Sequence, residues 1–98
     1  MTNLIAALNA NAMVAANAAS NVANLNTQDY KSIHTTITQG ANGDPAAVTH
    51  RTTTPGSPTE DGRESSNVEL PQEFGDMLLA RSGYEAALGA IRKRDEML

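Results

Sequence analysis

Residues 3–26 read NLIAALNANAMVAANAASNVANLN, a stretch without a charged side chain. Its apolar positions recur every three or four residues, as in the heptad seam of a coiled coil: Ile5, Leu8, Ala12, Ala15, Ala19 and Val22. This spacing predicts one long amphipathic helix over residues 3–26. Because asparagine is a poor helix former and the stretch has no i,i+4 ion pairs, we expect the helix to form only when its seam packs against a partner.

The C-terminal end of the chain carries a matching pattern over residues 68–97. Its large apolar residues keep the same rhythm, with polar breaks at Arg81 and Asp95: Leu70, Phe74, Met77, Tyr84, Leu88 and Ile91. Pro71 suits the first turn of a helix, and Ser66 or Asn67 could cap it. Antiparallel pairing would set the small seam residues of the first helix opposite the large ones of the second. The sequence therefore predicts a mainly α fold, with two long terminal helices in an antiparallel, coiled-coil-like pair.

The middle of the chain has a different composition. Residues 40–66 hold three of the four prolines and four of the seven glycines, which is typical of turns and linkers. Before them, residues 30–39 alternate in the manner of a strand, Asn42-Gly43 is a hairpin-turn dipeptide, and residues 46–53 could return as a second strand. We expect one structural domain in three parts: an N-terminal helix (1–28), a short β-hairpin or irregular segment (29–66) and a C-terminal helix (67–98).

Composition argues against several functions. The 98 residues include no cysteine and carry a formal net charge of −4, which disfavours Cys-ligated metals and non-specific nucleic-acid binding. Neither His34 nor His50 has a partner at the sequence spacing of metal ligands. The carboxylates of Glu69, Glu73 and Asp76 fall at the start of the second helix, where they interact favourably with the positive end of the helix dipole. We expect no catalytic, cofactor-binding or metal-binding residues, and no enzyme activity. The asparagines and the missing basic n-region argue against a membrane-inserted helix and a cleaved signal peptide.

Two stretches carry a family resemblance. Residues 21–31, NVANLNTQDYK, resemble the N-terminal signature of the bacterial flagellar axial proteins of the rod, hook and hook-associated family. Residues 66–70 (SNVEL) and the stretch from Ala80 to the C-terminus resemble the C-terminal helix of the same family. The motif positions are Asn21, Val22, Ala23, Asn24, Asn26, Thr27, Tyr30, Lys31, Gly83, Tyr84, Glu85 and Ala86. Asp29 stands where the family commonly has glycine, and Ala87 stands where asparagine often follows Glu-Ala.

The short middle segment leaves no room for the large β domains of hook proteins, so the chain looks most like a short proximal rod protein. The resemblance implies a structural subunit of the flagellar basal-body rod, in the periplasm, that assembles with copies of itself and with other rod subunits through paired terminal helices. It also implies export by the flagellar type III apparatus with an uncleaved N-terminal signal. The resemblance also implies roles for single residues. The first helix would end at Asn21, Asn24, Asn26 and Thr27, and the helix pair would be anchored by Tyr84 and Leu88.

The alternative hypothesis is a soluble helical-hairpin adaptor, or a divergent rod paralogue, that binds a partner protein. The two hypotheses differ in their dependence on concentration. A rod subunit should be partly disordered when dilute and should form open-ended contacts, whereas an adaptor should be a closed, stably folded monomer or dimer.

Overall fold

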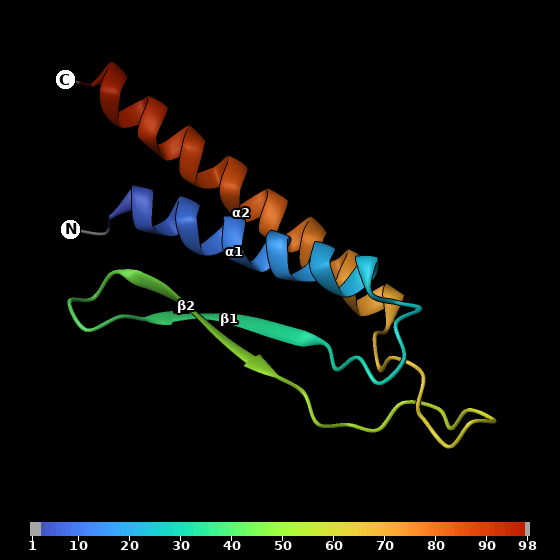
Figure 1. Cartoon of the computed structure of the whole chain (residues 1–98). Helices are drawn as coiled ribbons and strands as arrows, with labels where there is room; N and C mark the ends of the chain where they lie inside the picture. Colours follow the sequence, from blue (N-terminus) through green and yellow to red (C-terminus); the bar gives the residue numbers. More distant parts are fainter. Residues whose placement is uncertain (1–2, 98) are drawn as a thin grey trace.

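The computed structural model describes residues 3–97 and contains two helices with a β-hairpin between them (Figure 1). The elements are α1 (Leu4–Ala23), β1 (Ile33–Gln39), β2 (Pro45–Arg51) and α2 (Leu70–Glu96). The predicted terminal helices and the predicted hairpin are confirmed. The two helices, of 20 and 27 residues, make up about half of the chain, so the mainly α prediction holds only in part.

Helix α1 has an asparagine at each end. The side-chain oxygen of Asn3 accepts hydrogen bonds from the N–H groups of Ile5 and Ala6, at 3.0 and 3.2 Å, and so caps the first turn. The helix ends at Ala23, earlier than the predicted residue 26, and Asn24 is its C-cap. Thr27 donates from its N–H to the Asn24 carbonyl and from its hydroxyl to the Asn24 side-chain oxygen, both at 3.0 Å. This local turn competes with further helix.

Helix α2 begins at Leu70, with Pro71 in its first turn as predicted. The prediction that Ser66 or Asn67 caps this helix is wrong. Glu69 occupies the N-cap and makes no side-chain capping bond within residues 3–97. Ser66 instead donates to the carbonyl of Leu25, and the side-chain oxygen of Asn67 accepts from the N–H of Ser32, so both side chains bond the segment that follows α1. At the other end, Lys93 and Arg94 complement the helix dipole.

The hairpin pairs antiparallel from Ile33 opposite Arg51 to Gln39 opposite Pro45. Residues 40–44 form its loop, which is closed by a 2.6 Å hydrogen bond from the N–H of Gly40 to the carbonyl of Asp44. Gly43 has a φ of 87°, a left-handed conformation that glycine adopts without steric cost. The Asn42-Gly43 turn therefore lies where the sequence predicts it.

Helix α1 lies between α2 and the hairpin, so the molecule is a stack of three thin layers (Figure 1). Its extents are 63 × 25 × 14 Å, and the first turn of α1 lies at the same end of the molecule as the last turn of α2 (Figure 1). On the hairpin side, the Asn17 amide donates to the hydroxyls of Thr35 and Thr49, at 2.6 and 3.3 Å. Neither helix, within the described residues, is apolar over enough of its length to cross a membrane.

The buried apolar side chains are small. Four of the five are alanines: Ala10, Ala18, Ala80 and Ala87, with Val68 as the fifth. The predicted seam is not the buried one. Half of its residues are exposed, namely Ile5, Ala12, Ala19, Phe74, Tyr84 and Leu88, and the other half are only partly buried, namely Leu8, Ala15, Val22, Leu70, Met77 and Ile91.

The face of α2 that is buried differs from the predicted face. Its buried residues are Glu73, Ala80 and Ala87, which precede the predicted Phe74, Arg81 and Leu88 by one position, or about 100° around the helix. Small side chains let the helices approach closely. A Cβ atom added to Gly83 would lie 2.8 Å from Cγ of Asn11.

Candidate assembly site at the junction of the terminal segments

Asn21, in the last turn of α1, bonds both the first turn of α2 and the start of β1. It is fully buried, and its amide nitrogen donates to the Ile33 carbonyl at 2.7 Å and to Oε1 of Glu73 at 2.8 Å. Its oxygen accepts from the Tyr30 hydroxyl at 2.9 Å and from the Ile33 N–H at 2.8 Å. A side-chain amide has two donor hydrogens and two acceptor lone pairs, so Asn21 uses all of them. One residue thus connects α1, the start of β1 and α2.

Glu73 is the α2 side of this contact and is 1% exposed. The sequence placed it among the acidic residues that suit a helix start, and its burial was not predicted. Oε1 accepts from Asn21, whereas Oε2 has no hydrogen-bond partner within residues 3–97. Leaving a buried polar atom unpaired costs about 1–3 kcal/mol. The Asn21–Glu73 bond joins α1 to α2, and the unpaired oxygen of Glu73 lowers the stability that this contact provides.

Asp29 forms the turn that follows α1. Its φ of 61° is in the left-handed region, which glycine adopts more readily than a residue with a side chain. Its N–H donates to the Glu64 carbonyl at 2.8 Å, and its carboxylate accepts from the Glu64 N–H at 3.0 Å and from Nε of Arg63 at 2.7 Å. The Glu64 N–H, and then Arg63, hold the pKa of Asp29 below its ordinary value. These bonds hold a non-glycine residue in the turn.

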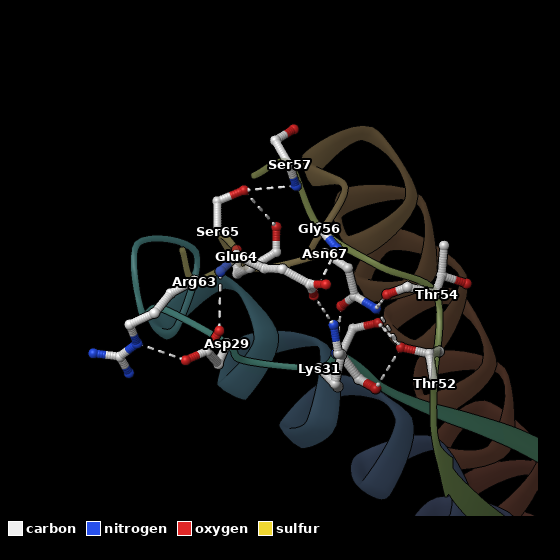
Figure 2. A network of polar contacts seen from close by, with 12 residues as sticks. Asp29, Lys31, Thr52, Thr54, Gly56, Ser57, Arg63, Glu64, Ser65 and Asn67 are labelled. Atoms are coloured by element: carbon white, nitrogen blue, oxygen red, sulfur yellow. Dashed lines mark hydrogen bonds and ion pairs between the residues drawn. The ribbon is translucent and has the colours of Figure 1, made fainter. Parts of the chain in front are cut away.

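A wider polar network ties the loop before α2 to this turn (Figure 2). Nζ of Lys31 donates to Oε2 of Glu64 at 2.6 Å, and the same oxygen accepts from the Gly56 N–H at 3.3 Å. The Lys31 bond is the main reason why the pKa of Glu64 is lowered. Gly56 lies so close to the neighbouring chain that an added Cβ would be 2.9 Å from the carbonyl carbon of Ser65. The loop can approach this closely because position 56 has no side chain.

Asn67 holds the hairpin to the other side of the same network (Figure 2). Its oxygen accepts from the Ser32 N–H at 2.6 Å, and its nitrogen donates to the Thr52 hydroxyl and to the Thr54 carbonyl, each at 2.8 Å. The Asn67 N–H donates to the Tyr30 carbonyl at 3.2 Å. The structure therefore brings residues 21–31 and 66–70, the two motif stretches, into one junction.

The other motif residues make none of the bonds that join the two stretches. Asn24 and Thr27 form the turn after α1, as expected, while Asn26 and Ala23 are exposed and Val22 is half-buried. Gly83 packs against Asn11, Glu85 pairs with Arg81 at 3.0 Å on the surface, and Ala86 is exposed. Tyr84 and Glu85 border an open groove between the helices, together with Asn11, Ala12, Ala15, Met77, Ala80 and Arg81. Sequence reasoning missed Asn11, Ser32 and the burial of Glu73, because none of them follows an apolar period.

Large apolar side chains lie on the outside of the molecule. On α2, Leu78 is 64% exposed and Leu79 is 73% exposed. Phe74, Tyr84 and Leu88 are also exposed, and Phe74–Leu78 and Tyr84–Leu88 are spaced four apart, as neighbours on a helix surface. Ile5, Met13, Ile37, Val48 and Met97 complete the exposed set. We call the exposed residues Phe74, Leu78, Leu79 and Leu88 the outer face of α2, while Tyr84 borders the groove between the helices.

Comparison of the chain with protein-family models found no match, and comparison with curated proteins found none either.

Proposed function

We propose that this chain is a structural subunit of the bacterial flagellar basal-body rod. It assembles with copies of itself and with other rod subunits through its two terminal helices. The observation that carries this proposal is the distribution of apolar side chains: the buried ones are mostly alanines, while the outer face of α2 exposes large side chains. Burial of a large apolar side chain stabilises by about 1.5–3 kcal/mol, so most of that energy remains available for contacts with neighbouring subunits.

The proposal includes an antiparallel, coiled-coil-like pairing of α1 and α2. Two contacts support it: Asn21 bonds Glu73, and Asn11 lies against Gly83. Between these contacts the residue number falls by ten in α1 and rises by ten in α2. Ala12 and Ala15 also share a groove with Arg81 and Tyr84. The Asn21–Glu73 pair sets the alignment, in the way that a single buried polar residue sets register in a coiled coil.

Export with an uncleaved N-terminal signal is part of the same proposal. Residues 1–28 carry no charged side chain and are rich in asparagine. Within the described residues, α1 owes its order to α2 and the hairpin, since its buried residues face those elements. A segment of this kind can stay unfolded during passage through the type III apparatus and become ordered when neighbours bury it.

The test is recovery of the chain in isolated hook–basal bodies. We expect mass spectrometry to find the chain there, and we expect deletion of its gene to abolish swimming. A chain carrying both Leu78→Ser and Leu79→Ser should leave the cytoplasm normally but be absent from the basal bodies. Ser82→Ala, an exposed change on the same helix, is the matched control and should be incorporated like the wild type.

The opposite pattern would support the adaptor hypothesis. In that case the chain would stay in the cytoplasm in complex with one partner, the basal bodies would lack it, and the deletion strain would swim.

A further inference from the structure

Two histidines lie directly opposite each other on the hairpin. In the β1–β2 register His34 pairs with His50, and the centroids of their rings are 6.1 Å apart, with the ring planes inclined at 40°. They are far apart in the sequence, so no ligand spacing could be recognised there. Strand pairing makes them neighbours.

The pair lies on the face of the hairpin that points away from α1. Side chains alternate between the two faces of a strand, and Thr35 and Thr49, the next residue on each strand, bond Asn17 of α1. His50 is exposed and His34 is half-buried. Arg51, the residue after His50, holds its guanidinium over the Tyr30 ring at 5.5 Å, away from the histidine face. Solvent therefore reaches the two imidazoles.

The ring separation is close to that of a two-histidine chelate. A zinc–nitrogen bond of 2.0–2.1 Å puts the centroid of each ring about 3.2 Å from the metal. At a tetrahedral angle the two centroids are then about 5.2 Å apart. The observed 6.1 Å differs from this by about one ångström, which rotation of the exposed His50 ring can close.

The neighbouring hydroxyls can orient one of the ligands. Oγ of Ser32 lies 3.5 Å from Nε2 of His34 and 3.0 Å from the Thr52 hydroxyl. Metal-binding histidines commonly use their second ring nitrogen for such a hydrogen bond. Nδ1 of His34 has no such neighbour within residues 3–97 and is the nitrogen that we assign to the metal.

We propose that His34 and His50 bind one divalent transition-metal ion that favours imidazole, of the class Zn²⁺, Ni²⁺ or Cu²⁺, with water in the remaining positions. Residues 3–97 hold no group of three or more metal-ligating side chains, so this is an open, two-ligand site. Its effect is to clip β1 to β2. A two-stranded hairpin is marginally stable by itself, so a metal clip adds order where the fold has least core.

The test is calorimetric titration of the full chain with Zn²⁺ at pH 7.5, repeated with Mg²⁺. We expect one Zn²⁺ per chain and no saturable heat with Mg²⁺, which prefers oxygen ligands. His34→Gln and His50→Gln should each weaken Zn²⁺ binding by about tenfold or more, while Thr36→Gln, an exposed change beside the pair, should bind like the wild type.

The proposal is overturned if the wild type shows no saturable Zn²⁺ binding, or if both histidine variants bind Zn²⁺ as tightly as the wild type. It is independent of the proposed rod function. The histidine variants should self-associate like the wild type, so failure of metal binding and failure of assembly are observed separately.

Discussion

Substitution of Gly83 tests the close contact between α1 and α2. Glycine within a helix costs about 1 kcal/mol relative to alanine, so Gly→Ala changes in α2 should stabilise it wherever there is space. At Gly75 and Gly89 an added Cβ meets nothing within 4 Å. At Gly83 the added Cβ would lie 2.8 Å from Cγ of Asn11 and closer still to its side-chain oxygen, well inside ordinary van der Waals contact.

The size of the effect follows from two opposing contributions. Extra volume in a packed contact costs about 1–3 kcal/mol, since Asn11 must rotate or the helices must separate. Rotation of Asn11 also breaks its 2.9 Å hydrogen bond to the Ala7 carbonyl. Relative to Gly89→Ala, we therefore expect Gly83→Ala to be less stable by about 1–3 kcal/mol. In a domain of this size, 1 kcal/mol corresponds to a change in Tm of about 4–8 °C.

The assay is thermal unfolding followed by circular dichroism, at one fixed protein concentration for all variants. Gly75→Ala and Gly89→Ala should raise the Tm, and Gly83→Ala should not. The double variant Asn11→Ala/Gly83→Ala removes the clashing side chain and should regain the stabilisation that Gly83→Ala lacks. If Gly83→Ala alone raised the Tm as much as Gly89→Ala does, the helices would not approach closely at this point and the described packing would be refuted.

Three further predictions concern the junction. Asn21→Ala leaves several buried polar groups without partners and should lower the free energy of unfolding by about 3 kcal/mol or more in denaturant titration, whereas the exposed Asn26→Ala should change it by less than about 0.5 kcal/mol. The pKa of Glu64 is lowered in the fold, so its contribution to the free energy of unfolding is complete above the ordinary pKa of 4.5 and is lost as the pH falls below that value. The difference in Tm between the wild type and Glu64→Gln that is measured at pH 7 should therefore vanish in acid. Gly56→Ala forces a Cβ against the Ser65 carbonyl and should lower the Tm strongly, and a Tm like that of the wild type would contradict this packing.

The helices and the hairpin could be predicted because their signals are local. The three- and four-residue spacing placed α1 and α2 within a few residues of their observed bounds, and Asn42-Gly43 marked the hairpin turn. The face of α2 that packs could not be predicted. Apolar periodicity selects large residues such as Phe74 and Leu88, whereas the contact uses Ala80 and Ala87, because small residues allow close approach.

The contact between Asn21 and Glu73 could not be predicted from local sequence patterns either. Asn21 was predicted to end a helix, but its partner Glu73 is 52 residues away, and only the packed fold brings the two together. The pairing of His34 with His50 depends on the register of the two strands, which the spacing of residues along the sequence does not determine. In each case the missing information is a long-range contact between residues that have no periodic signature of their own.

Sedimentation velocity over a wide range of concentrations tests the central claim most directly. The claim is that the outer face of α2 is buried only by neighbouring subunits. The average mass of the species formed by the full chain should therefore increase without a plateau as the concentration rises from low micromolar to near millimolar. The chain carrying Leu78→Ser and Leu79→Ser should stay small, and Ser82→Ala should grow like the wild type. A single mass at every concentration, whether that of a monomer or of a closed dimer, would contradict the account.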